Sequence, residues 1–328
     1  MKIVVIGLGS MGKRRIRLIK ENFNECEIVG IDNLEKRRKE AEEIFKIITY
    51  GNLEKININS LNIDVAFVCT SPLSHSFIIL ELLKNNINVF SEINLSNDKY
   101  KEIIELSKEK ELNCFLSSTM LYRKEIEYIE KKVKDKKEKV RYRYHVGQYL
   151  PDWHPWENYK EFFVGDKKTN GCRELLAIEL PWIVKTFGKI KKIFVTKDKI
   201  SDLNIDYPDN YLIILEHENG NKGCLNIDIV SREAIRDFEV YSNNMHIFWK
   251  GTPGSLEDYD IILKKRKKIE VYSNIEKDNR YAKNIIENAY LDEIKDFFSG
   301  LKKIGKSYKY TYEEDAYIIS IIDKIEKE

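Results

Sequence analysis

The chain has 328 residues, of which 42% are hydrophobic and 34% are charged, a composition typical of globular proteins and not of disordered or membrane-spanning ones. Its 56 Lys and Arg side chains nearly balance 54 Asp and Glu side chains, so a net charge of +2 gives no overall field that would attract nucleic acid or anionic lipid. We therefore expect two domains, a small-molecule partner, and no nucleic-acid or membrane partner.

Two further features bear on where the protein works. No apolar run reaches the roughly 18 residues that a membrane span needs, and the N-terminus has the pattern of a strand and not of a signal peptide. The five cysteines, Cys26, Cys69, Cys114, Cys172 and Cys224, show neither a disulfide framework nor the CxxC spacing of a zinc site. We expect a soluble, cytoplasmic protein with unreactive thiols and no metal.

The first 120 residues alternate short apolar runs with helical stretches. Residues 2–6 form a nearly continuous apolar run that ends in glycines, which is typical of a parallel strand buried on both faces. Further strands are predicted at residues 27–31, 47–50, 65–69, 88–90 and 113–117, with helices such as 34–45 and 74–84 between them. This alternation predicts right-handed βαβ units and a doubly wound Rossmann domain over residues 1–120.

A second architecture is predicted for residues 121–328, beginning with a helix over 124–134. Alternating strands and hairpin turns follow, and a helix over 174–186 contains Pro181, which is expected to kink the helix or to mark its true start. The predicted strands are 140–146, 211–218, 223–230, 238–241 and 246–250, and the later helices are 282–301 and 313–327. Together these elements predict an α+β domain with a largely antiparallel open sheet, suited to substrate binding and oligomerisation.

Two lysine-rich stretches, residues 131–139 and 264–268, fall in segments that we interpret as turns. Their side chains are able to contact phosphate groups, but acidic residues lie nearby. We therefore interpret both stretches as solvated surface.

The strongest motif in the chain is Gly7-Leu8-Gly9-Ser10-Met11-Gly12, which matches GxGxxG between the first predicted strand and a helical pattern. Gly7 permits a tight turn, Gly9 lets backbone approach a pyrophosphate, and Gly12 lets helix and strand pack closely. The helix N-terminus favours the phosphate charge. Asp32 closes the second strand about 20 residues further on, where a carboxylate binds a ribose 2′-hydroxyl. We predict a dinucleotide site formed by Gly7, Leu8, Gly9, Ser10, Met11, Gly12, Asp32 and Asn33.

Asp32 favours NAD as the cofactor, because a carboxylate repels a 2′-phosphate. Arg15, Arg37 or Arg38 would relieve that repulsion and keep NADP as the alternative. The fourth strand ends at the carboxyl edge of the sheet, where ligands bind in such folds. There, Ser71 and Ser74 are also suited to cap the next helix. The residues predicted to line the cofactor cleft at this edge are Cys69, Thr70, Ser71, Pro72 and His75.

These motifs resemble those of the Gfo/Idh/MocA oxidoreductases, which include glucose-fructose oxidoreductase and inositol dehydrogenase. The resemblance covers almost the whole chain and rests on GLGSMG, on CTSPLSH at residues 69–75, on NVFSEINLS at residues 88–96, and on the order of the two domains. It implies a sugar, cyclitol or nucleotide-sugar substrate, oxidised or reduced at one carbon by NAD(H) or NADP(H) bound between the domains. It also implies that Glu92 and Ile93 contact the cofactor.

Two positions depart from the family pattern. The family usually has Glu-Lys-Pro after the fifth strand, with a lysine that helps position substrate and nicotinamide, whereas this chain has Glu92-Ile93-Asn94. The family helix that bears a catalytic histidine, with an aspartate three residues away, here carries Glu179 and Trp182 at those positions. The family's catalytic residues therefore cannot be assigned to these positions, and the catalytic residues have to be inferred from the side chains of this sequence.

The segment from Tyr144 to Trp156 is the densest set of functional groups, with two of the five histidines and two of the four tryptophans. Its prolines disfavour regular structure, so we expect an ordered loop. Hydride transfer from an alcohol needs a base, and an imidazole titrates near neutral pH, so His154 is the first candidate base. Trp153 or Trp156 is suited to stack on a sugar ring, and Tyr149 offers a hydroxyl. Alternatively, these aromatics and His154 pack a domain interface.

The second candidate set is Arg173, Glu174 and Glu179 on one predicted helix. Glu179 is the candidate catalytic residue of this set, because it interrupts an apolar run. A buried carboxylate is costly unless it is paired or functional, and burial favours the protonated form that a general acid uses. The alternative is a structural pair with Arg173 or Lys185, or an exposed side chain. Arg232 and Arg236 are suited to bind an anionic group such as a carboxylate or diphosphate. The candidate substrate ligands are Tyr122, Arg123, Tyr149, Trp153 and Arg173.

We interpret the chain as an NAD(P)-dependent oxidoreductase that transfers hydride at a carbinol or carbonyl carbon of a sugar or nucleotide sugar, in surface-polysaccharide biosynthesis. One alternative is a catalytically altered dinucleotide-binding sensor or partner subunit, which the missing family lysine favours. Another is a lyase or epimerase that recycles NAD within one turnover. Because an exposed face on the second sheet commonly pairs in such folds, we expect a homodimer or homotetramer.

Overall fold

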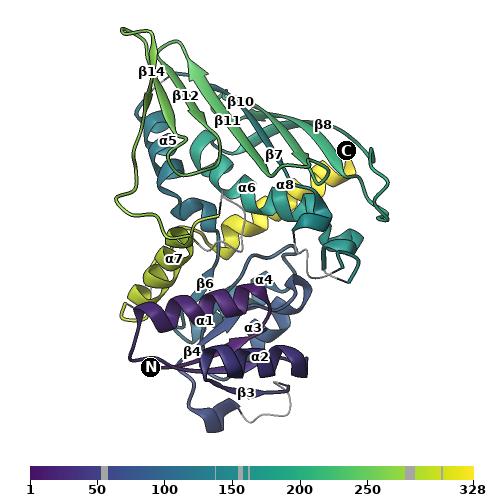
Figure 1. Ribbon diagram of the computed structural model, residues 1–328, viewed down its shortest axis with the longest axis vertical. Coiled ribbons are helices and arrows are strands. Elements are labelled where there is room, and N and C mark those ends of the chain that lie inside the picture. The colour runs from purple at the N-terminus through teal and green to yellow at the C-terminus, as the bar shows by residue number, and fades with distance from the viewer. Residues whose placement is uncertain (53–57, 137, 154–157, 162, 278–284, 304–305) are drawn as a thin grey trace. The chain divides into compact units, whose positions relative to one another are not determined.

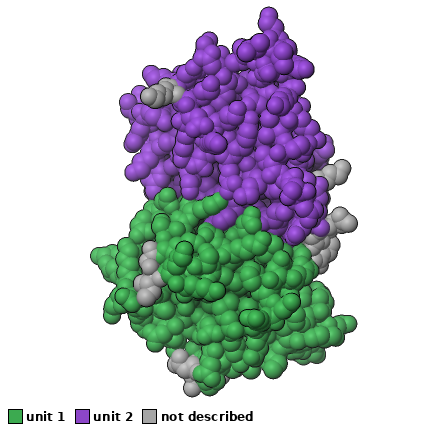
Figure 2. All heavy atoms as spheres, turned by 90° about the vertical axis from the view of Figure 1, so that its left-hand side faces the viewer, with its two compact units in different colours: residues 1–118, 290–316 green, residues 119–289, 317–328 purple. Residues whose placement is uncertain are grey.

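The computed structural model describes all residues of the chain except 53–57, 137, 154–157, 162, 278–284 and 304–305. The described residues form two compact units (Figure 2). The first unit contains residues 1–118 and 290–316, and the second contains residues 119–289 and 317–328. The chain therefore leaves the first unit after residue 118, returns to it at residue 290 and leaves it again after residue 316.

A parallel sheet forms the centre of the first unit, in the order β3-β2-β1-β4-β5-β6. The central strands β1 and β4 are almost fully buried, as continuous apolar runs in a sheet covered on both faces should be. The strand order reverses at β1, so the carboxyl ends of β1 and β4 form the switch point where ligands bind in such sheets. The strands are β1 (Lys2–Ile6), β2 (Glu27–Ile31), β3 (Ile48–Tyr50), β4 (Val65–Val68), β5 (Asn88–Ser91) and β6 (Cys114–Leu116).

Helices connect these strands and confirm the predicted Rossmann architecture (Figure 1). The helix predicted to begin at residue 74 begins at His75, because Pro72–Ser74 forms a separate 3-10 turn, η2, with Pro72 at its first position. The helices of this region are α1 (Ser10–Asn22), α2 (Glu35–Phe45), α3 (His75–Lys84) and α4 (Tyr100–Glu109), and a further 3-10 turn, η1, covers Ile58–Leu61.

Helix α7 (Glu287–Gly300) contributes to the first unit through a buried ion cluster. Arg15 of α1 is fully buried, and its guanidinium binds Glu92 (Nε to Oε1, 2.6 Å) and Glu293 of α7 (Nη2 to Oε2, 2.7 Å). Phe297 of α7 packs its ring against those of Phe67, Phe90 and Phe115. Charged and aromatic contacts thus join the returning segment to the sheet.

The second unit contains an open sheet in the order β14-β13-β12-β11-β7-β10-β9-β8. Every neighbouring pair is antiparallel except β7 and β10, which confirms the predicted, largely antiparallel sheet. The stretch 264–268, interpreted as a turn, instead contains the edge strand β14, where lysines discourage pairing with another edge. The strands are β7 (Arg141–Gly147), β8 (Ile190–Asp198), β9 (Asn210–His217), β10 (Lys222–Asp228), β11 (Ile235–Ser242), β12 (Met245–Trp249), β13 (Glu257–Asp260) and β14 (Lys265–Lys268).

Helices cover one face of this second sheet and leave the other open (Figure 1). Along β7, Tyr142 and Tyr144 are buried, whereas Arg143 between them is exposed. Tyr142 stacks on Phe187 with ring centroids 4.1 Å apart, and Tyr144 contacts Trp182 edge-on. The remaining elements are α5 (Lys124–Asp135), α6 (Gly171–Phe187), α8 (Tyr312–Lys327) and the 3-10 turns η3 (Thr119–Tyr122), η4 (Leu150–Asp152), η5 (Phe163–Gly165) and η6 (Lys167–Thr169).

Helix α6 starts at Gly171, three residues earlier than predicted. Asn170 caps it, because its side-chain oxygen accepts the Arg173 N–H at 2.8 Å. Pro181 lies inside the helix and so does not mark its start. Within the described residues, no helix combines the length and apolar character that crossing a bilayer requires.

Replacing Arg15 tests the buried ion cluster. In Arg15→Met two carboxylates lose their buried partner, so we expect the free energy of unfolding to fall by about 3–5 kcal/mol. Urea denaturation followed by circular dichroism measures this change. Lys101→Met, which removes a lysine that is 86% exposed from a surface pair, is the control and should leave stability nearly unchanged. Equal losses in both variants would contradict the assignment.

Candidate functional sites

The glycine-rich stretch forms the turn between β1 and α1. Gly7 has a φ of +92°, and its N–H donates to the carbonyl of Ile31 at 2.8 Å. A Cβ at Gly7 would lie 2.5 Å from the carbonyl oxygen of Cys69, and one at Gly12 would lie 1.9 Å from the oxygen of Gly7. The protein's own backbone therefore requires glycine at both positions.

Gly9 differs from these two glycines. Its φ of −72° suits any residue, and a Cβ there would meet only the guanidinium of Arg37, with Nη1 3.6 Å away. Internal packing thus does not explain the missing side chain. The open space lies at the N-terminus of α1, where backbone N–H groups and the helix dipole favour phosphate. The turn from Gly9 through Ser10 and Met11 therefore fits a dinucleotide pyrophosphate.

Asp32 lies directly after β2 and is buried. Its Oδ2 accepts the N–H of Leu8 and its Oδ1 accepts the N–H of Leu34, both at 2.8 Å. The carboxylate is therefore held beside the glycine turn, as a ribose-binding acid must be.

Two arginines flank this carboxylate. Nη1 of Arg37 lies 4.0 Å from Oδ2 of Asp32, and Nη1 of Arg38 donates to the carbonyls of Asp32 and Asn33 at 2.7 and 3.1 Å. Arg15 is instead buried with Glu92 and Glu293 and is not available for a 2′-phosphate. Among the described residues, Arg37 and Arg38 are therefore the positively charged side chains that lie beside Asp32.

The carboxyl end of β4 leads into a hydrogen-bonded turn. Oγ1 of Thr70 lies 2.8 Å from Oγ of Ser74, which donates to the carbonyl of Ser71 at 2.7 Å. Cys69 is buried, and burial raises the pKa of its thiol well above the usual range. Thr70 and Ser71 are therefore the more accessible polar groups of this predicted set.

His75, predicted to line the cleft, is a buried connecting residue. One ring nitrogen lies 2.7 Å from Oδ1 of Asn94, and the other lies 2.9 Å from the carbonyl of Thr70. Burial lowers the pKa of the imidazole. His75 thus links the end of β4 to the segment after β5, where Glu92 is held by Arg15 and Ile93 is half-buried.

Residues 1–118 match the protein family described as an oxidoreductase family with an NAD-binding Rossmann fold, Gfo/Idh/MocA. This match covers the parallel sheet of the first unit and does not extend into the second unit. For these residues it confirms the resemblance predicted from the motifs, and it indicates the NAD-binding domain of an oxidoreductase. No curated protein sequence matches the chain.

Solved structures share the fold of both units. An NAD-binding oxidoreductase from Klebsiella pneumoniae is 14% identical, with a TM-score of 0.78 over 100% of this chain and 96% of that one. An oxidoreductase from Agrobacterium radiobacter, solved with NAD+, L-tartaric acid and magnesium, is 13% identical, with a TM-score of 0.77 over 98% and 94%. UDP-N-acetylglucosamine 3-dehydrogenase from Acidithiobacillus ferrooxidans is 12% identical, with a TM-score of 0.76 over 100% and 97%. At these identities the likeness concerns the fold.

In the second unit, Glu179 is fully buried and bound by three donors. Its Oε2 accepts the Tyr144 hydroxyl and the Trp182 indole N–H, both at 2.8 Å, and its Oε1 accepts Nε of Arg236 at 2.9 Å. The pairing considered from sequence, with Arg173 or Lys185, is wrong, because the ion-pair partner is Arg236. Both carboxylate oxygens are therefore engaged, and the arrangement holds Arg236 in place.

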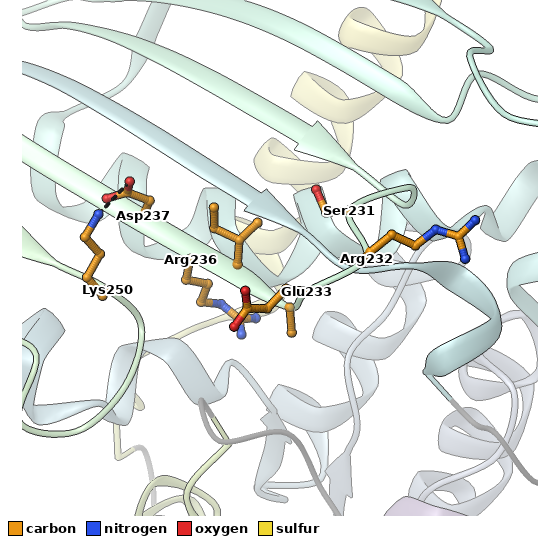
Figure 3. Close-up of a pocket in the computed structure, with 8 residues that line it drawn as sticks. Ser231, Arg232, Glu233, Arg236, Asp237 and Lys250 are labelled. Atoms are coloured by element: carbon orange, nitrogen blue, oxygen red, sulfur yellow. Dashed lines mark ion pairs between the residues drawn. The ribbon is translucent and has the colours of Figure 1, made fainter.

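Arg236 is one of the residues that line a pocket of about 390 Å³ (Figure 3). Residues 231–237 and Lys250 form its walls. Arg232 lies over the ring of Tyr149, 3.8 Å from its centroid, and Lys250 pairs with Asp237 at 2.8 Å. Arg232 and Arg236, the two arginines suited to bind an anionic group, thus line the same pocket.

Two other predicted substrate ligands are held in ion pairs. Arg123 is buried and pairs with Glu125, Nη2 to Oε1 at 2.8 Å. Arg173 pairs with Asp323 of α8 at 2.8 Å and with Glu326. Both arginines therefore have structural partners in the second unit.

The remaining predicted residues lie in the loop regions. Tyr122 is buried in η3, and the indole N–H of Trp153 donates to the carbonyl of Gln148 at 3.0 Å. His154, the first candidate base, lies outside the described residues, as does Trp156.

Glu174 belongs to the same candidate set as Arg173 and Glu179. It lies in the first turn of α6, and its Oε2 is buried without a hydrogen-bond partner among the described residues. Burial raises the pKa of this carboxyl to about 8.

The two kinds of glycine in the turn make a matched test. Gly9→Ala places a methyl group where the pyrophosphate would lie, so we expect NADH affinity to fall by about tenfold or more at unchanged melting temperature. Gly12→Ala forces its Cβ against backbone and should lower stability by about 1–3 kcal/mol. Nicotinamide fluorescence titration and differential scanning fluorimetry measure the two effects. Full NADH affinity in Gly9→Ala would place the cofactor elsewhere.

Proposed function

We propose that this protein transfers hydride at a carbinol or carbonyl carbon of a sugar that carries an anionic group, such as a nucleotide sugar, in surface-polysaccharide biosynthesis. The observation that carries the proposal is the arginine-containing pocket in the second unit of an NAD(P)-binding oxidoreductase. A fold neighbour that acts on a UDP-sugar supports the same substrate class.

The chemistry of the pocket suits such a substrate. Its volume falls within the roughly 300–1,000 Å³ common for small-molecule sites. Guanidinium groups bind phosphate and carboxylate oxygens through paired hydrogen bonds, and Arg232 and Arg236 supply two of them. Glu233 and Asp237 also line the pocket and offer acceptors for sugar hydroxyls.

Asp32 supports NAD as the preferred dinucleotide, because its fixed carboxylate would repel a 2′-phosphate. Arg37 and Arg38 keep NADP as the alternative, since they place positive charge beside that carboxylate. When bound, the cofactor would accept the hydride as an alcohol is oxidised, or return it to a carbonyl.

We infer a different role for Glu179, one of the two residues first proposed as acid and base. Three donors occupy the oxygens of Glu179, so it positions Arg236 and does not exchange a proton with substrate. His154 remains the proposed base for the hydroxyl proton. Glu174 is the second proposal, because a carboxyl whose pKa is about 8 can accept and donate protons near neutral pH.

A protein that binds the dinucleotide without turnover, as a sensor or partner subunit, is the second candidate function. Ile93 favours it, because the family lysine that normally helps position substrate is absent at this position. A lyase or epimerase that recycles NAD would instead convert substrate without net change in NADH.

A substrate screen with variants tests the proposal. Purified protein is mixed with NAD or NADH and a panel of sugars and nucleotide sugars, while absorbance follows NADH and chromatography follows product. We expect Glu179→Gln to raise KM for an anionic sugar about tenfold or more with little change in kcat, because it loosens Arg236. His154→Ala or Glu174→Gln should lower kcat by about 10²-fold or more, whichever is the base.

The control for this screen is Glu218→Gln, which alters an exposed carboxylate. Loss of kcat at unchanged KM in Glu179→Gln would return that residue to the role of acid or base. Dinucleotide binding with no conversion of any substrate would favour the sensor, and product formation without net NADH change would favour the lyase or epimerase.

We also propose that the protein forms a homodimer or homotetramer through the open face of the second sheet. Phe194, Ile214 and Cys224 are register neighbours on β8, β9 and β10, and all three are exposed. Leu212 lies two residues along β9 and is 45% exposed. An apolar row of this kind is suited to pack against a second copy.

Light scattering coupled to gel filtration measures this assembly. We expect the wild-type protein to elute with the mass of two or four chains, and Ile214→Glu to shift it toward one chain by burying charge in the interface. Ile200→Glu alters a residue that is 61% exposed outside the strands and is the control. A wild-type monomer would refute the proposal.

A further inference from the structure

The hairpin of β13 and β14 carries an exposed apolar tip. Ile261, Ile262 and Leu263 at the turn are 46%, 90% and 60% exposed. Oδ1 of Asp260 accepts the N–H groups of Ile262 at 3.0 Å and of Leu263 at 2.8 Å. The turn is therefore fixed by its own hydrogen bonds while its aliphatic side chains remain in water, which is unfavourable unless something covers them.

Five basic residues follow this tip, at positions 264–268. Arg266 pairs with Glu257 at 3.1 Å, and Lys268 pairs with Glu270 at 2.8 Å. Among the described residues, no carboxylate forms an ion pair with Lys264, Lys265 or Lys267. Three lysines without an ion pair to any described residue thus lie beside the apolar tip, with Asp260 and Asp258 opposite Lys265 and Lys267 in the strand register.

The second lysine-rich stretch of the chain lies next to the hairpin. Asp258 of β13 binds Nζ of Lys132 at 2.9 Å and the hydroxyl of Tyr128 at 2.8 Å, and both residues belong to α5. Asp258 is also the register partner of Lys267. The end of α5, with exposed lysines at 131, 134 and 136, therefore adjoins the basic hairpin (Figure 1).

We propose that this surface, residues 261–268 together with 131–136, binds an anionic lipid membrane, with the apolar tip in the interface and the lysines at headgroup phosphates. A lipid surface offers both an apolar layer and negative charge, which match the two halves of the surface. Nucleic acid would leave the aliphatic tip uncovered, and the same surface on a second copy would be repelled by its charge. The near-neutral overall charge of the chain conceals this local excess.

Sedimentation of the full-length protein with vesicles tests the proposal. We expect binding to vesicles of phosphatidylcholine and phosphatidylglycerol, weakening with salt, and little binding to phosphatidylcholine alone. A triple variant should reduce the vesicle partition coefficient about 100-fold, because each lysine near an anionic surface raises that coefficient several-fold. Its substitutions are Lys264→Gln, Lys265→Gln and Lys267→Gln. Ile262→Ser/Leu263→Ser should reduce the coefficient about tenfold or more.

The matched control is Lys191→Gln/Lys192→Gln/Lys199→Gln, which removes the same charge from exposed lysines elsewhere on the second unit and should bind like wild type. No binding to anionic vesicles, equal binding to neutral ones, or equal losses in the control would overturn the proposal. Binding of a DNA duplex without vesicle binding would do the same. Turnover in solution should not change in any of these variants, so the result is independent of the proposed function.

Discussion

The close approach of backbone to backbone at the turn after β1 is the constraint on which the rest of the first unit depends. Gly7 and Gly12 leave no space for a Cβ, because carbonyl oxygens of the protein occupy it. At Gly9, between them, a Cβ would meet only the end of the Arg37 side chain, with Nη1 3.6 Å away. Folding therefore requires glycine at positions 7 and 12, whereas a bound ligand explains the missing side chain at position 9.

Buried charge organises both units around their sites. In the first unit Arg15 joins the segment after β5 to α7, and in the second Glu179 fixes Arg236 at the wall of the pocket. Breaking either cluster costs free energy of folding, because the remaining partner would be an unpaired charge buried away from water. The mechanism we propose uses this rigidity, since an arginine that is already positioned loses less freedom when it binds an anion.

The sequence predicted what short-range patterns encode. The glycine turn, Asp32 and the buried parallel strands follow from local spacing and apolar runs, and the structure places them as expected. Long-range partners were not predictable in this way. Glu293 meets Arg15 across 278 positions and Arg236 meets Glu179 across 57, and no local pattern links either pair. The edge strand β14 was also missed, because its lysines have the composition of a turn.

A crystal structure of the protein with NADH bound would show where the dinucleotide lies. We expect pyrophosphate oxygens within hydrogen-bonding distance of the backbone N–H groups that follow Gly9, and adenosine ribose hydroxyls at Asp32. A dinucleotide bound anywhere else, or protein that stays empty at saturating NADH and NADPH, would contradict this expectation.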